Sequence, residues 1–290
     1  MKLRKIGKIE SGQDIAIYGE YLFDFVAHGV CLGECSVYKT ADIKLYGGNE
    51  CEPISKFTLD KTDVIIPHCN SACFGNEFYE EGDEFPLLYL NVYNNYHNCD
   101  VRNEGICCVY RLMRDGVNFD SELVQLIEIG FVENSELWKS YPGREDRRPY
   151  GNFIIDRENG KYYGYVARDK NQTTRYFSFD IPKARDGEFD GRFGIRLKTL
   201  TEADINYHFD GEHTYMQGGC VHNGLIYSVS GGRNNPEIRV IDPIAKTQKF
   251  AFNFKDIGIA EEPEGIEFDG DLCYLVVGYG DTYIIEDVVR

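Results

Sequence analysis

Apolar and aromatic residues alternate with polar ones in short runs, and these runs recur in five similar units. Each unit contains one such run, a turn rich in Gly, Asn or Asp, and a second run. Alternation with a period of two predicts half-buried β-strands. The turn residues tolerate the positive φ of tight hairpins. The five units open at Gln13, Asn70, Gly151, Gln217 and Glu264.

Further strands follow each predicted hairpin. A third strand is predicted in "CSVYKTADIKL", "ICCVYRLMR", "TTRYFSFDI", "PEIRVIDP" and "DTYIIEDV". A fourth, outer strand follows in most units and begins at Ile54, Leu123, Gly191 and Thr247. Four strands per repeat form the blade of a propeller. The sequence therefore predicts an all-β fold, a five-bladed β-propeller with four-stranded antiparallel blades.

The last unit holds only three strands before Arg290. We expect residues 2–9 to supply its outer strand, because an open ring would leave an unpaired strand edge. The N-terminal strand would then close the ring in the last blade. No linker is apparent, so residues 1–290 are predicted to form a single propeller domain. A β-sandwich also contains many short strands, but it does not explain five repeated units.

The amino-acid composition is typical of a protein built from strands and turns, and the net charge limits the kinds of molecule that the protein can bind. The chain has 21 Tyr, 18 Phe and 30 Gly, and 31 basic against 48 acidic residues give a net charge of −17. Such a charge repels nucleic acid and anionic membranes at long range. Neither a secretory signal nor an apolar run of membrane-spanning length is present. We expect a cytoplasmic protein, or a secreted one if a leader has been removed.

Ten cysteines are present, and most of them fall within apolar strand patterns. We expect small buried thiols, since cytosolic reductants keep such groups reduced. There is no C-x-x-C pair, and neither a metal nor a cofactor is expected. If a leader has been removed, the pairs Cys31–Cys35 and Cys69–Cys73 become disulfide candidates.

Polar residues open the innermost strand of every predicted blade. In a propeller these strands begin at one end of the central channel, so residues far apart in the sequence converge there. The predicted ligand-binding residues are Gln13, His68, Asn70, Tyr150, Asn152, Gln217, Glu262 and Glu264, with Arg233 beside them. Convergent polar groups in a concave site favour a ligand pocket. The alternative is that they tie the inner strands to each other and to channel water.

Within this set, His68 and Glu264 are the candidates for an acid–base pair, because a His and a carboxylate can exchange protons near neutral pH. A fixed hydrogen-bond donor is the alternative role for His68. The sequence contains no nucleophile elbow, P-loop or dinucleotide fingerprint.

Three stretches carry a family resemblance. They are "HCNSACF" at His68, "YMQGGCVHNGLIYSVSG" at Tyr215 and "EPEGIEFDGDLCYLVVG" at Glu262. They resemble blade openings of the five-bladed propellers in teichoic acid biosynthesis protein C, helveticin-type bacteriocins and a phage receptor-binding protein. The resemblance implies contact with cell-surface polymers and sugars, with His68, Asn70, Gln217, Glu262 and Glu264 around the pocket.

These observations lead to three functional hypotheses. The first is binding of a carbohydrate or similar polar small molecule at the channel mouth, with no reaction derivable. The second is a hydrolase or lyase that acts on a sugar or lactone through Glu264 and His68. The third is a scaffold for protein partners, which predicts an exposed apolar patch.

Overall fold

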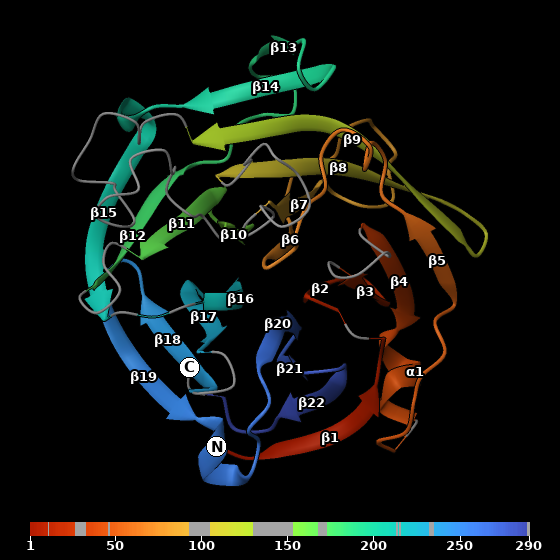
Figure 1. Cartoon of the computed structure of the whole chain (residues 1–290), viewed down its shortest axis with the longest axis vertical. Helices are drawn as coiled ribbons and strands as arrows, with labels where there is room; N and C mark the ends of the chain where they lie inside the picture. Colours follow the sequence, from red (N-terminus) through yellow and green to blue (C-terminus); the bar gives the residue numbers. More distant parts are fainter. Residues whose placement is uncertain are drawn as a thin grey trace.

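The computed structural model describes residues 1–10, 12–26, 33–45, 47–92, 105–129, 153–167, 173–212, 214, 216–231 and 235–288. Five small, mainly antiparallel sheets stand in a ring around a central axis (Figure 1). The prediction of an all-β, five-bladed β-propeller is confirmed. Across the described ranges, no helix has both the length and the apolar character needed to span a membrane.

Each blade is built outward from an inner strand at the axis. The first blade contains β2 (Asp14–Tyr18), β3 (Tyr21–Val26), β4 (Glu34–Lys39) and β5 (Ser55–Thr58). The second contains β6 (Ala72–Phe74), β7 (Leu88–Asn91), β8 (Ile106–Asp115) and β9 (Asn118–Ile129). The third contains β10 (Phe153–Asp156), β11 (Lys161–Ala167), β12 (Thr173–Asp180) and β15 (Ile205–Glu212).

The remaining two blades complete the ring. The fourth contains β16 (Met216–His222), β17 (Leu225–Ser230), β18 (Glu237–Asp242) and β19 (Thr247–Asn253). The fifth contains β20 (Pro263–Asp269), β21 (Leu272–Val277), β22 (Asp281–Ile285) and β1 (Leu3–Lys8). The inner strands β2, β6, β10, β16 and β20 contact each other in this order, and β20 contacts β2.

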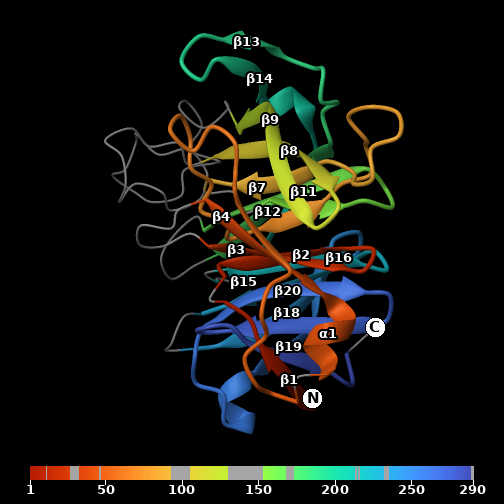
Figure 2. The same ribbon diagram turned by 90° about the vertical axis from the view of Figure 1, so that its right-hand side faces the viewer.

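The N-terminal strand closes the ring as predicted. β1 pairs antiparallel with β22, from Leu3 opposite Ile285 to Lys8 opposite Asp281. The side chain of Ile6 is buried in the same apolar cluster as Tyr274 and Ile284. Both ends of the chain therefore belong to one blade (Figure 2).

Two strands extend the second blade. β14 (Ile195–Leu200) lies parallel to β9, and β13 (Glu188–Asp190) pairs with β14. The sequence predicts that the strand beginning near Gly191 is the outer strand of the third blade. This prediction is wrong, because the strand belongs to the second blade. β14 goes to the second blade because Ile195 and Leu197 pack on its core.

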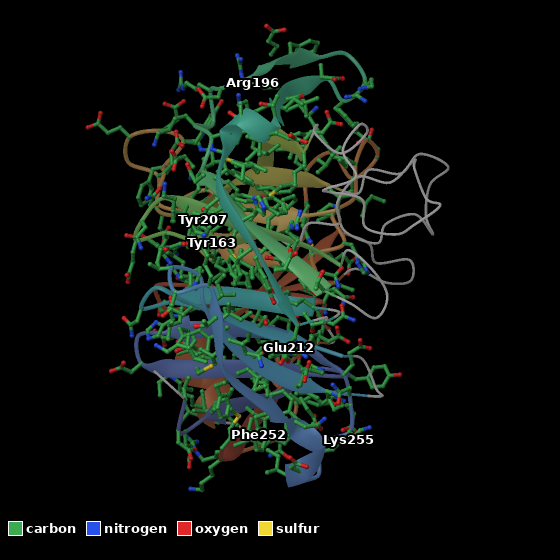
Figure 3. The ribbon with its side chains drawn as sticks, turned by 90° about the vertical axis from the view of Figure 1, so that its left-hand side faces the viewer. Tyr163, Arg196, Tyr207, Glu212, Phe252 and Lys255 are labelled. Carbon is green, nitrogen blue, oxygen red and sulfur yellow. The ribbon has the colours of Figure 1, made fainter. Side chains whose placement is uncertain are left out.

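The outer strand of the third blade is β15 instead. Its buried and exposed positions alternate, and Ile205, Tyr207 and Phe209 pack on the cluster that contains β11 and β12. Figure 3 shows Tyr207 beside Tyr163 of β11, because both residues pair with Ser178 of β12.

The predicted third strand of the first unit is shorter than expected. β4 ends at Lys39, and the helix α1 (Thr40–Leu45) follows directly. Helix α1 packs against β1 and β4, with Ile43 1% exposed. It therefore covers the boundary between the fifth and first blades.

Aromatic side chains fill the spaces between neighbouring blades. Phe23 and Phe85 meet edge to face, with ring centroids 5.7 Å apart, and Phe74 and Phe119 join the same cluster. Such pairs add to the hydrophobic stabilisation from buried area. The high Tyr and Phe content therefore serves packing between sheets.

The eight described cysteines are all buried and free. Burial raises the pKa of the Cys107 thiol to about 12, which lowers its thiolate fraction and reactivity. Cys69 and Cys73 form no disulfide. Cys31 lies outside the described residues.

Candidate functional site

The channel has two ends, which we define by the inner strands. At the opening end the inner strands begin. At the hairpin end they turn back into the second strand of each blade. Five of the residues predicted to bind a ligand flank the opening end, and their side chains form two hydrogen-bonded groups: Gln13, Asn70, Gln217, Glu262 and Glu264.

The first group joins the first and fifth blades. Gln13 directly precedes β2, and its Nε2 donates to Oε2 of Glu264 at 2.8 Å. Glu264 is the second residue of β20, and both side chains are half-buried. The hydrogen bond links residues 251 positions apart in the chain.

The second group crosses the axis. Asn70 precedes β6 in the second blade, and its Nδ2 donates to Oε1 of Gln217 in the fourth blade at 2.6 Å. Gln217 in turn donates through Nε2 to Oε1 of Glu262. Side chains from the second, fourth and fifth blades therefore share one hydrogen-bond chain.

Glu264 has an unusual protonation state. Burial, reinforced by the negative charge of Glu262, raises its pKa from 4.5 to about 8. At neutral pH the carboxyl group is therefore mostly neutral and can donate a proton. A carboxylic acid kept neutral in this way is able to act as a general acid.

Sequence reasoning missed Asp14, whose side chain lies against the inner strands of three other blades, β6, β16 and β20. Its side chain is 1% exposed, and its Oδ2 accepts from the backbone N–H of Ala72 at 2.9 Å. Burial is the main reason that its pKa is raised well above the usual range, and Glu267 and Glu264 add to this shift. Asp14 thus ties the first inner strand to the second.

Two glycines make room for Asp14. A Cβ atom on Gly265 would lie 2.5 Å from Oδ1 of Asp14, and one on Gly218 would lie 3.0 Å from the same atom. The sequence signal for this crowding is a glycine directly after the polar opening residue, in "QGG" and "EG". Glycine permits the close approach of neighbouring backbones.

His68 occupies the loop before β6. Its backbone N–H donates to the carbonyl of Asn91 at 2.9 Å, as does that of Cys69 at 3.1 Å. Cys69 has a φ of 59°, so the chain turns sharply here. Within the described ranges Gln13 is the hydrogen-bond partner of Glu264, and no bond joins Glu264 to His68. The acid–base pair stays a prediction.

The remaining predicted residues, Tyr150, Asn152 and Arg233, lie outside the described residues. In the part of the chain that is described, no group of three or more His, Cys, Asp or Glu side chains is arranged to hold a metal ion.

The raised pKa of Glu264 predicts a pH-dependent stability. The folded protein holds this proton more tightly than the unfolded chain, so the stabilisation is complete below about pH 4.5 and is lost as the pH rises through about 8. We expect Glu264→Gln to match the parent at pH 5 and to exceed its free energy of unfolding at pH 9 by about 4 kcal/mol. Urea unfolding at the two pH values measures this difference.

The control for this experiment is Glu81→Gln, which removes a charge from an exposed position. We expect its difference from the parent to be the same at both pH values. A Glu264→Gln difference that is equally independent of pH would contradict the raised pKa.

Comparison with known proteins identifies the fold class. The sequence matches no protein-family model, and no curated protein matches it significantly. The structure is similar to glutaminyl cyclase from Myxococcus xanthus, with a TM-score of 0.53, 11% identity, and coverage of 100% of this chain and 96% of that chain. An exo-β-1,3-galactanase from Phanerochaete chrysosporium gives a TM-score of 0.49 at 10% identity, with coverage of 98% and 64%. The chain is a five-bladed β-propeller, and at these identities the similarity shows the fold alone.

Proposed function

We propose that the opening end of the channel binds a carbohydrate or a similarly hydroxyl-rich small molecule. The observation that carries the proposal is the meeting of Gln13, Asn70, Gln217, Glu262 and Glu264 in hydrogen-bonded groups from four blades. Amides and carboxyls side by side offer alternating donors and acceptors, which match the paired hydroxyls of a sugar. The resemblance of the blade openings to propellers associated with cell-surface polymers supports the same class of ligand.

The hydrogen bonding of Asn70 adds support. Its Nδ2 donates to Gln217, but its buried Oδ1 has no partner within the described ranges. An unsatisfied buried acceptor costs about 1–3 kcal/mol. A ligand hydroxyl that donates to this oxygen after a small rotation of the amide would remove that cost. Tyr150, Asn152 and Arg233 are the further residues expected to contact the ligand.

The second candidate function is an enzyme, and the protonation state of Glu264 favours it. A carboxyl group with a pKa of about 8 can protonate a leaving oxygen at neutral pH. His68 would then serve as the base in a hydrolase or lyase that acts on a sugar or lactone. A rate that falls with an apparent pKa near 8, and falls at least a hundredfold in Glu264→Gln, would favour this enzyme over a simple binder.

A scaffold function has less support. The exposed large apolar side chains of the described ranges lie on separate elements. They include Leu45, Val117, Phe189, Ile244 and Tyr279. A protein partner stays a prediction without a defined surface.

A glycan array tests the proposal directly. We expect the purified protein to bind a defined subset of glycans, and Gln217→Ala and Glu264→Ala to weaken that binding at least tenfold by removing shared hydrogen bonds. The matched control is Gln248→Ala, which removes an exposed amide from outer strand β19 and should leave binding unchanged. Equal binding by all variants, or no binding by the parent, would overturn the proposal.

A further inference from the structure

A cavity lies at the hairpin end of the channel, opposite the polar residues described above. It has a volume of about 400 Å³ and is lined by residues 17–19, 156–158, 221–223 and 267–270. These segments are the β2–β3, β10–β11, β16–β17 and β20–β21 hairpins, so four blades contribute to one hollow. Its volume falls within the range of small-molecule sites.

Glu267 forms the chemical centre of this cavity. It lies on inner strand β20, three residues after Glu264, or roughly 10 Å along the strand. Its side chain is 3% exposed yet lines the cavity. Oε1 accepts from the backbone N–H of Phe268 at 2.8 Å, and Nη2 of Arg157 lies 4.0 Å from the same oxygen. Across the described part of the chain, Oε2 receives no hydrogen bond.

Two stacked aromatic rings line the same cavity as this carboxyl group. The rings of His222 and Phe268 are stacked with centroids 3.9 Å apart and an angle of 3° between their planes. Nδ2 of Asn223 and Nε2 of His222 are 2.9 Å apart, which fixes the orientation of the imidazole. A planar group in the cavity would find a preformed stacking surface.

The charge of the lining determines which ligand fits. The carboxyl groups that line the cavity are those of Asp156, Glu158, Glu267 and Asp269, against the single guanidinium of Arg157. Asp156 is held by Asn159, and Asp269 lies 3.8 Å from Lys44. Glu267 is therefore the buried carboxyl with an oxygen left for a ligand, in a cavity whose net charge attracts cations.

We propose that the hairpin end of the channel is a second binding site, which takes a small organic cation with a guanidinium or ammonium group. The cationic group hydrogen-bonds to Oε2 of Glu267, and a planar guanidinium stacks on the ring of His222. A charge-assisted hydrogen bond to a buried carboxylate is stronger than one between neutral groups. The site is separate from the sugar site proposed at the opening end, because Glu267 lies roughly 10 Å along β20 from Glu264. Asp14 packs closely against Gly218 and Gly265 near the opening end.

The affinity is expected to depend on pH. Burial raises the pKa of Glu267 to about 7, although the charge of Arg157 and the Phe268 N–H oppose the shift. The carboxyl group ionises as the pH rises from 6 to 8, so binding of a cation should tighten over that range. The other titratable or charged groups around Glu267 are Asp14, Cys73, Asp156, Arg157, Glu158, Cys220, His222, Asp269 and Cys273.

Isothermal titration calorimetry with n-butylguanidinium, n-butylammonium and n-butylurea tests the proposal. The urea is a neutral analogue of the guanidinium compound. We expect both cations to bind at pH 8 at least tenfold more tightly than the urea, and n-butylguanidinium to bind most tightly. Binding of the cations should weaken at least threefold at pH 6.

Two variants locate the site. Glu267→Gln keeps the shape and the acceptor for the Phe268 N–H, and it should weaken binding of n-butylguanidinium at least tenfold. Glu81→Gln removes an exposed charge outside the lining of this cavity and should change binding less than threefold. Gln217→Ala acts at the opening end and should leave cation binding unchanged even if glycan binding is lost. Equal affinity for all three probes, or unaltered binding in Glu267→Gln with a native circular dichroism spectrum, would overturn the second site.

Discussion

Replacing Gly218 by alanine is expected to lower the free energy of unfolding by at least about 3 kcal/mol. The added Cβ atom would lie 2.3 Å from the carbonyl oxygen of Glu264 and 3.0 Å from the Cα atom of Gly265. Both atoms belong to the backbone of β20, which is paired with β21 and contacts β2 on its other side. The clash therefore cannot be relieved by a change of rotamer. Urea unfolding followed by circular dichroism measures the loss.

Gly191→Ala provides the matched control. This glycine has open space around the position of a Cβ atom, and its φ lies outside the left-handed region. The same chemical change should alter the free energy of unfolding by only about 0.5 kcal/mol. Similar losses in the two variants would show that the inner strands are not packed as tightly at the axis as the structure indicates.

Removal of residues 1–8 is expected to abolish cooperative unfolding. The truncation takes away β1, leaves β22 with an unpaired edge, and exposes the apolar cluster around Tyr274 and Ile284. Ile6 alone, which is 1% exposed, contributes the burial of a whole side chain, worth about 1.5–3 kcal/mol. Loss of the near-ultraviolet circular dichroism signal and binding of a hydrophobic dye would report the open ring.

Two controls separate strand pairing from surface charge. The double variant Lys2→Gln and Arg4→Gln removes ion pairs with Glu286 from largely exposed side chains, and it should unfold like the parent because exposed ion pairs contribute little. A synthetic peptide of residues 1–10, added in excess, should restore the truncated protein. A truncated chain that unfolds at the parent's midpoint would show that β1 is dispensable.

The repeat of alternating runs was sufficient to predict the blades, because each hairpin is encoded locally. The meeting of Gln13 with Glu264, and of Asn70 with Gln217, also followed from the repeat, since equivalent strand positions become neighbours in a ring. The pairing of β14 with β9 could not be predicted from the repeat, because the sequence of an amphipathic strand does not indicate which strand it pairs with. The burial of Asp14 could not be predicted for a similar reason. In the sequence, a polar residue in a strand looks the same whether it faces solvent or lies between buried strands.

The cavity at the hairpin end also could not be predicted from the sequence. His222, Asn223 and Asp269 belong to turns whose composition is fully explained by hairpin geometry. Their shared position around Glu267 depends on the radial arrangement of the blades, which brings four separate turns together. The feature that marks this cavity is the buried carboxyl group of Glu267, and burial was not visible in the sequence.

The pairing of β1 with β22 affects how the protein folds during synthesis on the ribosome. β1 emerges first, but its partner β22 begins at Asp281. At about 5–20 residues per second, the first strand waits for tens of seconds before it can pair. Blades one to four have all their strands before that point, whereas the fifth cannot assemble until β22 has been synthesised. During synthesis, β1 must therefore be kept from pairing with other strands. The lysines and arginine of residues 2–8 serve this purpose, because charged side chains at a strand edge discourage association with other strands.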